Sequence, residues 1–177
     1  MKNDTNTPFR PLSRSARLAA GALLLAGAAH GSDGERTPRV TLIKPYVAEC
    51  AACHIAFLPG HLPAASWGRL MAGLGKHYGT DATLDPKDIQ LISQWLNANA
   101  DDRPRAAAAV PEDRITRTDW FVRKHRSIEA ATWRLPSVKS ASNCMACHTG
   151  ADRGQFGEHA LRRPEGLSAR QRATWDD

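Results

Sequence analysis

Two copies of one five-residue pattern, Cys-x-x-Cys-His, constrain this chain more than any other feature of it. The first copy is Cys50–His54 and the second is Cys144–His148, and together they use all four cysteines of the 177 residues. This pattern is typical of c-type haem attachment. Two thiols three residues apart can each form a thioether to one porphyrin, and the histidine that follows can bind the iron from below the ring. We therefore expect two covalently attached haem c groups, with the cofactor-binding cysteines Cys50, Cys53, Cys144 and Cys147 and the proximal ligands His54 and His148.

Two other uses of paired cysteines fit the sequence less well. Zinc ribbons separate their pairs by roughly 15 to 20 residues, whereas Cys53 and Cys144 lie 91 positions apart. A redox-active disulfide of thioredoxin type is the second alternative. Neither use requires a histidine directly after each pair, so haem attachment is the preferred interpretation.

Residues 1–31 have the pattern of a signal peptide. Four of the 24 Lys and Arg residues precede an apolar run from Leu18 to Ala29, which small residues follow. An uncleaved anchor would need roughly 20 apolar residues, so cleavage is the preferred reading. We expect a soluble periplasmic protein that does not span the membrane after cleavage. Because part of the formal charge of +6 belongs to this segment, basicity gives no argument for a nucleic-acid partner.

The remaining sequence predicts a mainly α fold made of two small haem-binding domains. Their expected order is a mobile leader 32–39, an N-terminal haem domain 40–100, a linker 101–112, a C-terminal haem domain 113–163 and a disordered tail 164–177. The linker contains Pro104, four successive alanines and Pro111, although the alanines could equally form a short helix. Charges of both signs and little apolar periodicity favour disorder in the tail.

Helix signals are clearest in residues 86–99, where Asp85 can cap the helix and Pro86 fits its first position. A second helix is expected from Ser66 to about Tyr78, although three glycines weaken it. Thr118 and Asp119 mark the start of a short helix. Finally, Ser142 or Asn143 can cap a helix that carries the second haem motif.

Residues 114–126 contain five basic residues and one acidic residue, Asp119. Such a run is usually a solvated helix face. The functional alternative is a docking surface for an acidic redox partner, which would steer association.

The sixth ligand of each iron decides whether it only carries electrons or can also bind small molecules. The candidates are His61, His77, His125, His159 and Met71. His77 ends the apolar stripe Trp67, Leu70 and Leu74 and precedes the helix 86–99, an order similar to that of class I cytochromes c. His125 has Phe121 as an apolar neighbour at helical spacing. Met71 lies off the stripe and is expected in the core, while His61 and His159 stay open as rival ligands.

Four separated segments make the chain resemble the bacterial periplasmic dihaem cytochrome c family, named for a protein that partners the oxygen-binding sphaeroides haem protein. They are Cys50–His54, Leu74–Gly79, Arg114–Thr116 with Trp120, Phe121 and His125, and Val138–Ser140 with Asn143–His148. The resemblance covers roughly residues 40–163. It implies two haem domains, the first like a class I cytochrome c, and bis-histidine haems whose distal ligands are His77 and His125. It also implies electron passage from a membrane cytochrome b to a soluble oxygen-binding c-type haem protein. The chain continues beyond Arg163, where the resemblance ends.

These observations predict an electron shuttle with two low-potential haems rather than an enzyme, since methionine as axial ligand would raise the potential. A haem enzyme, such as a peroxidase or small-molecule reductase, is the first alternative, and a haem-based sensor is the second. Both need one open iron. The surplus of candidate histidines argues against them.

Overall fold

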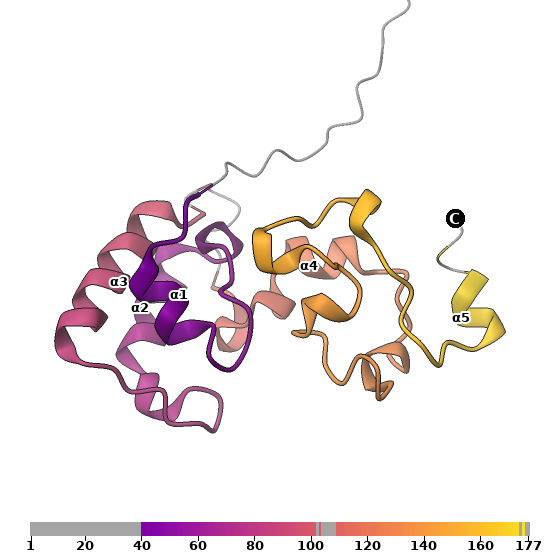
Figure 1. Ribbon diagram of the computed structural model, residues 1–177, viewed down its shortest axis with the longest axis horizontal. Helices are drawn as coiled ribbons and strands as arrows, with labels where there is room; N and C mark the ends of the chain where they lie inside the picture. Colours follow the sequence, from indigo (N-terminus) through magenta and orange to yellow (C-terminus); the bar gives the residue numbers. More distant parts are fainter. Residues whose placement is uncertain (1–39, 102, 104–108, 174, 176–177) are drawn as a thin grey trace, which may run out of the picture. The chain divides into compact units, whose positions relative to one another are not determined.

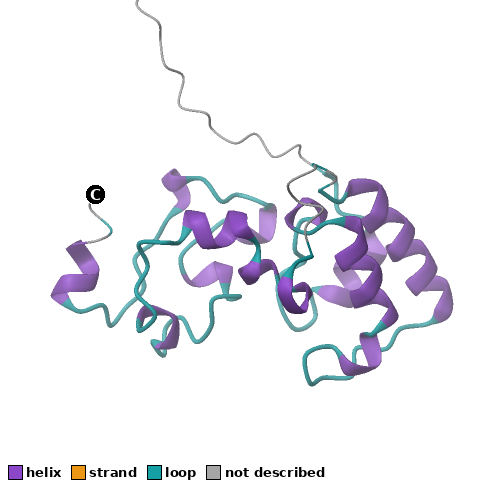
Figure 2. Cartoon of the chain, turned by 180° about the vertical axis from the view of Figure 1, so that it is seen from behind, coloured by secondary structure: helices purple, strands orange, loops and turns teal. Residues whose placement is uncertain are grey.

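The computed structural model describes residues 40–101, 103, 109–173 and 175. Five α-helices occur in this part of the chain: α1 Lys44–Cys50, α2 Ala64–Ala72, α3 Pro86–Asn99, α4 Asp119–Lys124 and α5 Ala169–Ala173. Short 3₁₀ turns and loops join them, and the described residues form no β-strand (Figure 2). The predicted mainly α fold is therefore confirmed. The predicted signal peptide and leader fall outside the described residues, and the domain and linker boundaries stay predictions.

Helix α3 packs against both α1 and α2 around a core (Figure 1). Its fully buried members include Leu62, Ile92 and Leu96. Met71 is also buried there, as expected. Two aromatic side chains satisfy their polar atoms at the core's edge, because the Tyr46 hydroxyl donates to the Phe57 carbonyl at 2.7 Å and the Trp67 indole to the Pro59 carbonyl at 2.7 Å.

Helix α3 begins at Pro86 as the sequence predicts, but its cap differs from the expected one. Asp85 occupies the N-cap position, yet its side chain accepts no capping hydrogen bond. Asp88 supplies negative charge in the first turn, where it interacts favourably with the helix dipole. The helix therefore begins at the proline without help from the Asp85 carboxylate.

The bounds expected for the second helix were wrong at both ends. Helix α2 begins at Ala64 because Pro63 is extended and its carbonyl accepts the first hydrogen bonds, from the amides of Ser66 and Trp67. It ends at Ala72 because Gly73 follows, and each glycine costs a helix about 1 kcal/mol. The chain then continues in a 3₁₀ turn, Leu74–Lys76, which leads to His77.

The second half has little regular structure. Its predicted helix at Thr118 is confirmed as α4, with the Phe121 amide donating to the Thr118 hydroxyl at 3.1 Å. The prediction of a helix at the second haem motif was wrong, because Cys144–Ala146 forms only a 3₁₀ turn. The Asn143 side chain donates to the Val138 carbonyl at 3.0 Å instead of capping a helix.

The tail was expected to be disordered, and this was wrong for residues 164–173. Ser168 and Gln171 cap helix α5 reciprocally: the Gln171 backbone amide donates to the Ser168 hydroxyl, and the Ser168 backbone amide donates to Oε1 of the Gln171 side chain. The pattern Ser-x-x-Gln is a capping box. This signal is present in the sequence, but the prediction of disorder relied on the charge composition of the tail instead. Gln171 is buried against Thr132, which joins the tail to the preceding segment.

Candidate functional site

The first cysteine motif lies at the end of α1. Cys50 is the last residue of that helix, and Cys53 and His54 follow in the turn behind it. The imidazole of His54 is exposed, and its Nδ1 lies 2.7 Å from the Ile55 carbonyl oxygen. A histidine that ligates a metal usually donates its other ring N–H in this way. His54 is therefore oriented with Nε2 available as a ligand atom.

His77 faces this motif from the other end of α2. The centroids of the His54 and His77 rings lie 6.2 Å apart, with the ring planes inclined by 34°. The turn after His77 holds it in place, since the Thr80 amide donates back to the His77 carbonyl at 3.0 Å. Tyr78 and Gly79 both have positive φ, 50° and 97°, as this type of tight turn requires. Glycine adopts such a conformation without cost.

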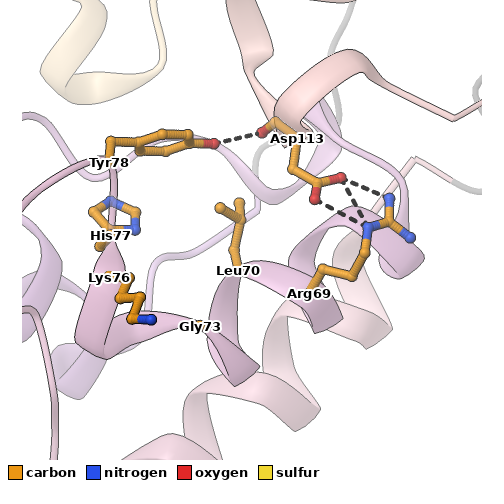
Figure 3. A pocket seen from close by; sticks show the side chains of 7 residues that line it. All are labelled: Arg69, Leu70, Gly73, Lys76, His77, Tyr78 and Asp113. Atoms are coloured by element: carbon orange, nitrogen blue, oxygen red, sulfur yellow. Dashed lines mark hydrogen bonds and ion pairs between the residues drawn. The ribbon is translucent and has the colours of Figure 1, made fainter.

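A hollow of about 240 Å³ opens beside His77 and is bordered by charged side chains. Figure 3 shows the contacts around it: the Tyr78 hydroxyl donates to the Asp113 carbonyl at 3.0 Å, and Arg69 pairs with the Asp113 carboxylate at 2.6 Å. The Arg114 guanidinium lies 4.1 Å from the centroid of the Tyr78 ring, a cation–π contact. These contacts fasten the turn that carries His77 to residues 112–114.

The second motif pairs with His125 in the same manner. The His125 and His148 ring centroids lie 6.1 Å apart, and the rings are inclined by 80°. His125 follows α4 directly, and its Nδ1 lies 2.9 Å from the Phe121 carbonyl oxygen. The Phe121 ring stacks on the imidazole with centroids 4.0 Å apart. The amphipathic spacing of Phe121 and His125 thus places both on the inner side of α4.

The two ring separations allow a test of whether one haem iron fits between each pair. An imidazole nitrogen binds a first-row metal at about 2 Å, and the ring centre lies roughly 1 Å behind that nitrogen. Two imidazoles on opposite sides of one iron therefore have centroids about 6 Å apart, as both pairs do. Nδ1 of His77 and Nδ1 of His148 are buried without a hydrogen-bond partner among the described residues, as are Nδ1 of His61 and Nε1 of Trp120. Such atoms are costly unless another group pairs with them.

Burial favours the neutral form of the site histidines and cysteines. It lowers the pKa of His77, His125 and His148, with His54 and Arg114 adding to the effect at His77. A neutral imidazole is the form that binds a metal. Burial also raises the pKa of Cys50 and Cys144 to about 11. All four motif cysteines are free thiols, so none is committed to a disulfide.

The rival ligands lie elsewhere. His61 is stacked on Trp120, with centroids 5.4 Å apart, and meets the edge of Phe156 at 5.1 Å. His159 is exposed in the 3₁₀ turn Glu158–Ala160. Sequence reasoning missed the surroundings of His61, because its partners come from segments that lie 59 and 95 positions further along. Phe156 was missed too, although its ring also contacts His148 at 5.5 Å.

Two further observations concern metal binding and membrane insertion. Among the residues that the structure describes, no three His, Cys, Asp or Glu side chains form a group that could hold a metal ion. None of the helices in the described part of the chain is long and apolar enough to cross a membrane.

Comparisons with known proteins give a consistent result. The family model described as dihaem cytochrome c matches residues 46–156. The crystal structure of DHC purified from Rhodobacter sphaeroides is similar at 41% identity and a TM-score of 0.58, covering 66% of this chain and 99% of that one. A dihaem cytochrome c from Shewanella baltica OS155 is similar at 34% identity and a TM-score of 0.58, covering 67% of this chain and 90% of that one. No curated relative matches by sequence.

Proposed function

The chain belongs to the dihaem cytochrome c family, and on that premise we propose that it is a periplasmic electron shuttle with two bis-histidine haems. Membership implies an electron-transfer protein with two c-type haems, and the cysteines for their attachment are present. In the proposal, His54 and His77 hold the first iron and His125 and His148 the second. The observation that carries it is the matched separation of the two histidine pairs, 6.2 and 6.1 Å.

The protein's own residues have positioning roles in this proposal. The Ile55 and Phe121 carbonyls accept from Nδ1 of His54 and His125, which orients each ring. Phe121 covers one face of the His125 ring. When bound, each haem iron supplies the chemistry by changing between the ferric and ferrous states, one electron at a time. No residue is required as an acid, a base or a nucleophile, so we do not propose an enzyme.

Two nitrogen ligands at each iron favour low reduction potentials, because an axial methionine is the ligand that raises them. We further propose that the donor is a membrane cytochrome b and the acceptor a soluble oxygen-binding c-type haem protein. This part rests on the family resemblance. The periplasmic location rests on the signal-peptide pattern of residues 1–31 and on the export that c-type haem attachment requires.

The test is the optical spectrum of the reduced holoprotein with and without carbon monoxide. We expect no change in the wild type, because both irons are closed by histidines. His77→Ala should let carbon monoxide bind half of the haem, and His125→Ala should do the same at the other site. His159→Ala is the matched control, since this exposed histidine should leave the spectrum unchanged. A wild-type response at half of the haem would show one open iron and favour the enzyme alternative.

A further inference from the structure

Helix α4 has two different faces within six residues. Its inner face carries Phe121, which is 8% exposed and stacks on His125. Its outer face carries Val122, which is 57% exposed. Since an α-helix with its side chains is about 10 Å across, the surface around Val122 lies within one helix diameter of His125. A molecule bound to this surface would lie close to the second histidine pair.

Basic residues follow Val122 in the sequence. Arg123, Lys124 and Arg126 line, with Ser127, a shallow hollow of about 330 Å³. The Arg123 guanidinium makes one long contact, to the Asp119 carbonyl at 3.5 Å. Within the described ranges, neither Arg123 nor Arg126 forms an ion pair with a carboxylate. Their charge is therefore directed to solvent.

The other basic residues of the run 114–126 are used differently. Arg114 and Arg117 both pair with Glu112, at 3.1 and 3.4 Å. Arg114 also lies over the Tyr78 ring. The structure thus divides a run that looks continuous in the sequence: Arg114 and Arg117 pair with Glu112, whereas Arg123 and Arg126, in the segment that carries the exposed Val122, do not. We call Val122, Arg123, Lys124, Arg126 and Ser127 the α4 face.

We propose that the α4 face is where an acidic surface of a redox protein docks to exchange an electron with the second haem. The inference rests on the proposed function, because the exchange requires that His125 and His148 hold a haem. One electron passes between the two redox centres, so one is oxidised as the other is reduced and no bond forms or breaks. Charge complementarity speeds the encounter and is screened by salt, while the exposed Val122 supplies an apolar contact.

The first experiment measures oxidation of the reduced holoprotein by hexacyanoferrate(III), an anion, and by hexaammineruthenium(III), a cation. Arg123→Glu/Arg126→Glu should slow the anionic reaction about tenfold at low ionic strength and speed the cationic one. Both effects should disappear in high salt. Lys44→Glu/Lys87→Glu makes the same change of net charge at the starts of α1 and α3, where glutamate suits the helix dipole. Equal effects in both double variants would overturn the proposal, because they would reflect only overall charge.

The second experiment uses poly-L-glutamate as an acidic polypeptide and the amide NMR spectrum of the ferrous holoprotein. The amide chemical-shift changes caused by poly-L-glutamate should be concentrated at residues 119–127. They should disappear in Arg123→Gln/Arg126→Gln, whose neutral side chains are compatible with the fold. Shifts spread evenly over the chain would contradict a docking face. The readout is independent of the iron ligands: shifts confined to residues 119–127 would support the α4 face even if carbon monoxide revealed an open haem. Closed haems with no such shifts would overturn the docking proposal alone.

Discussion

His61 illustrates how far a residue's surroundings can depart from its local sequence. It lies between Pro59 and Pro63, a context that indicates either an exposed side chain or a loop-borne ligand. The structure instead stacks it on Trp120 and against Phe156. Burial lowers the pKa of His61 to about 4. The side chain is thus neutral at pH 7 and packs like an aromatic residue.

This burial predicts a pH dependence of stability. An unfolded histidine has a pKa of about 6.5, so between pH 6.5 and 4 the unfolded chain binds a proton at His61 that the folded chain does not. Stability is present above the unfolded pKa and falls as the pH drops through this window, by on the order of 3 kcal/mol. His61→Leu should remove that part of the slope. Urea unfolding of the holoprotein between pH 4 and 8 measures it.

Comparison with a second variant isolates the effect, because the ligand histidines also titrate in the unfolded chain. His159→Leu removes an exposed histidine and should keep the full wild-type slope. If the wild type and His61→Leu lost stability in parallel on acidification, the neutral buried state of His61 would be wrong.

Among the elements, α4 depends on its neighbours and its cap. It has six residues, too few for a helix that is stable by itself. The Thr118 hydroxyl accepts from the Phe121 amide, and the inward Phe121 packs on His125. The helix therefore holds its shape through one cap and the aromatic contacts of Phe121 with His125 and Trp133.

Thr118→Ala should cost about 1 kcal/mol of unfolding free energy, because a helix loses that much with its N-cap. Thr118→Ser keeps the hydroxyl and should cost little. Asp85→Ala at the start of α3 offers a contrast, since the Asp85 side chain accepts no capping bond; its effect should be smaller. Urea unfolding midpoints measure all three. A loss in Thr118→Ser as large as that in Thr118→Ala would show that the cap is not the cause.

For the whole molecule, the tail contributes a buried polar contact between distant parts of the chain. The Gln171 amide group donates to the Thr132 hydroxyl at 2.9 Å, and these residues are 6% and 2% exposed. Arg170 adds an ion pair with Glu129 at 2.8 Å. Residues 164–173 are thereby packed on the segment that precedes the second haem motif.

Gln171→Leu should destabilise the protein by about 1 to 3 kcal/mol, because it leaves the Thr132 hydroxyl buried without this partner. Adding Thr132→Val removes the orphaned group, so the double variant should be more stable than the sum of the two single changes predicts. Chemical denaturation of the four proteins completes the cycle. Strict additivity would mean that the two side chains do not depend on each other.

Local information in the sequence determined the chemistry of this protein. The two Cys-x-x-Cys-His motifs, the helix at 86–99 and the Thr118 cap all depend on residues within a few positions of one another. Their spacing alone decides which atoms can meet. The capping box at Ser168 is equally local and could have been found.

Only the tertiary structure decided which distant groups meet. It brought His77 to His54 and His125 to His148, separations that support ligand assignments which remain predictions. It also packed His61 against Trp120 and Phe156. It divided the basic run, because Glu112 pairs with Arg114 and Arg117. Such encounters depend on how whole elements pack, and no spacing along the chain contains that information.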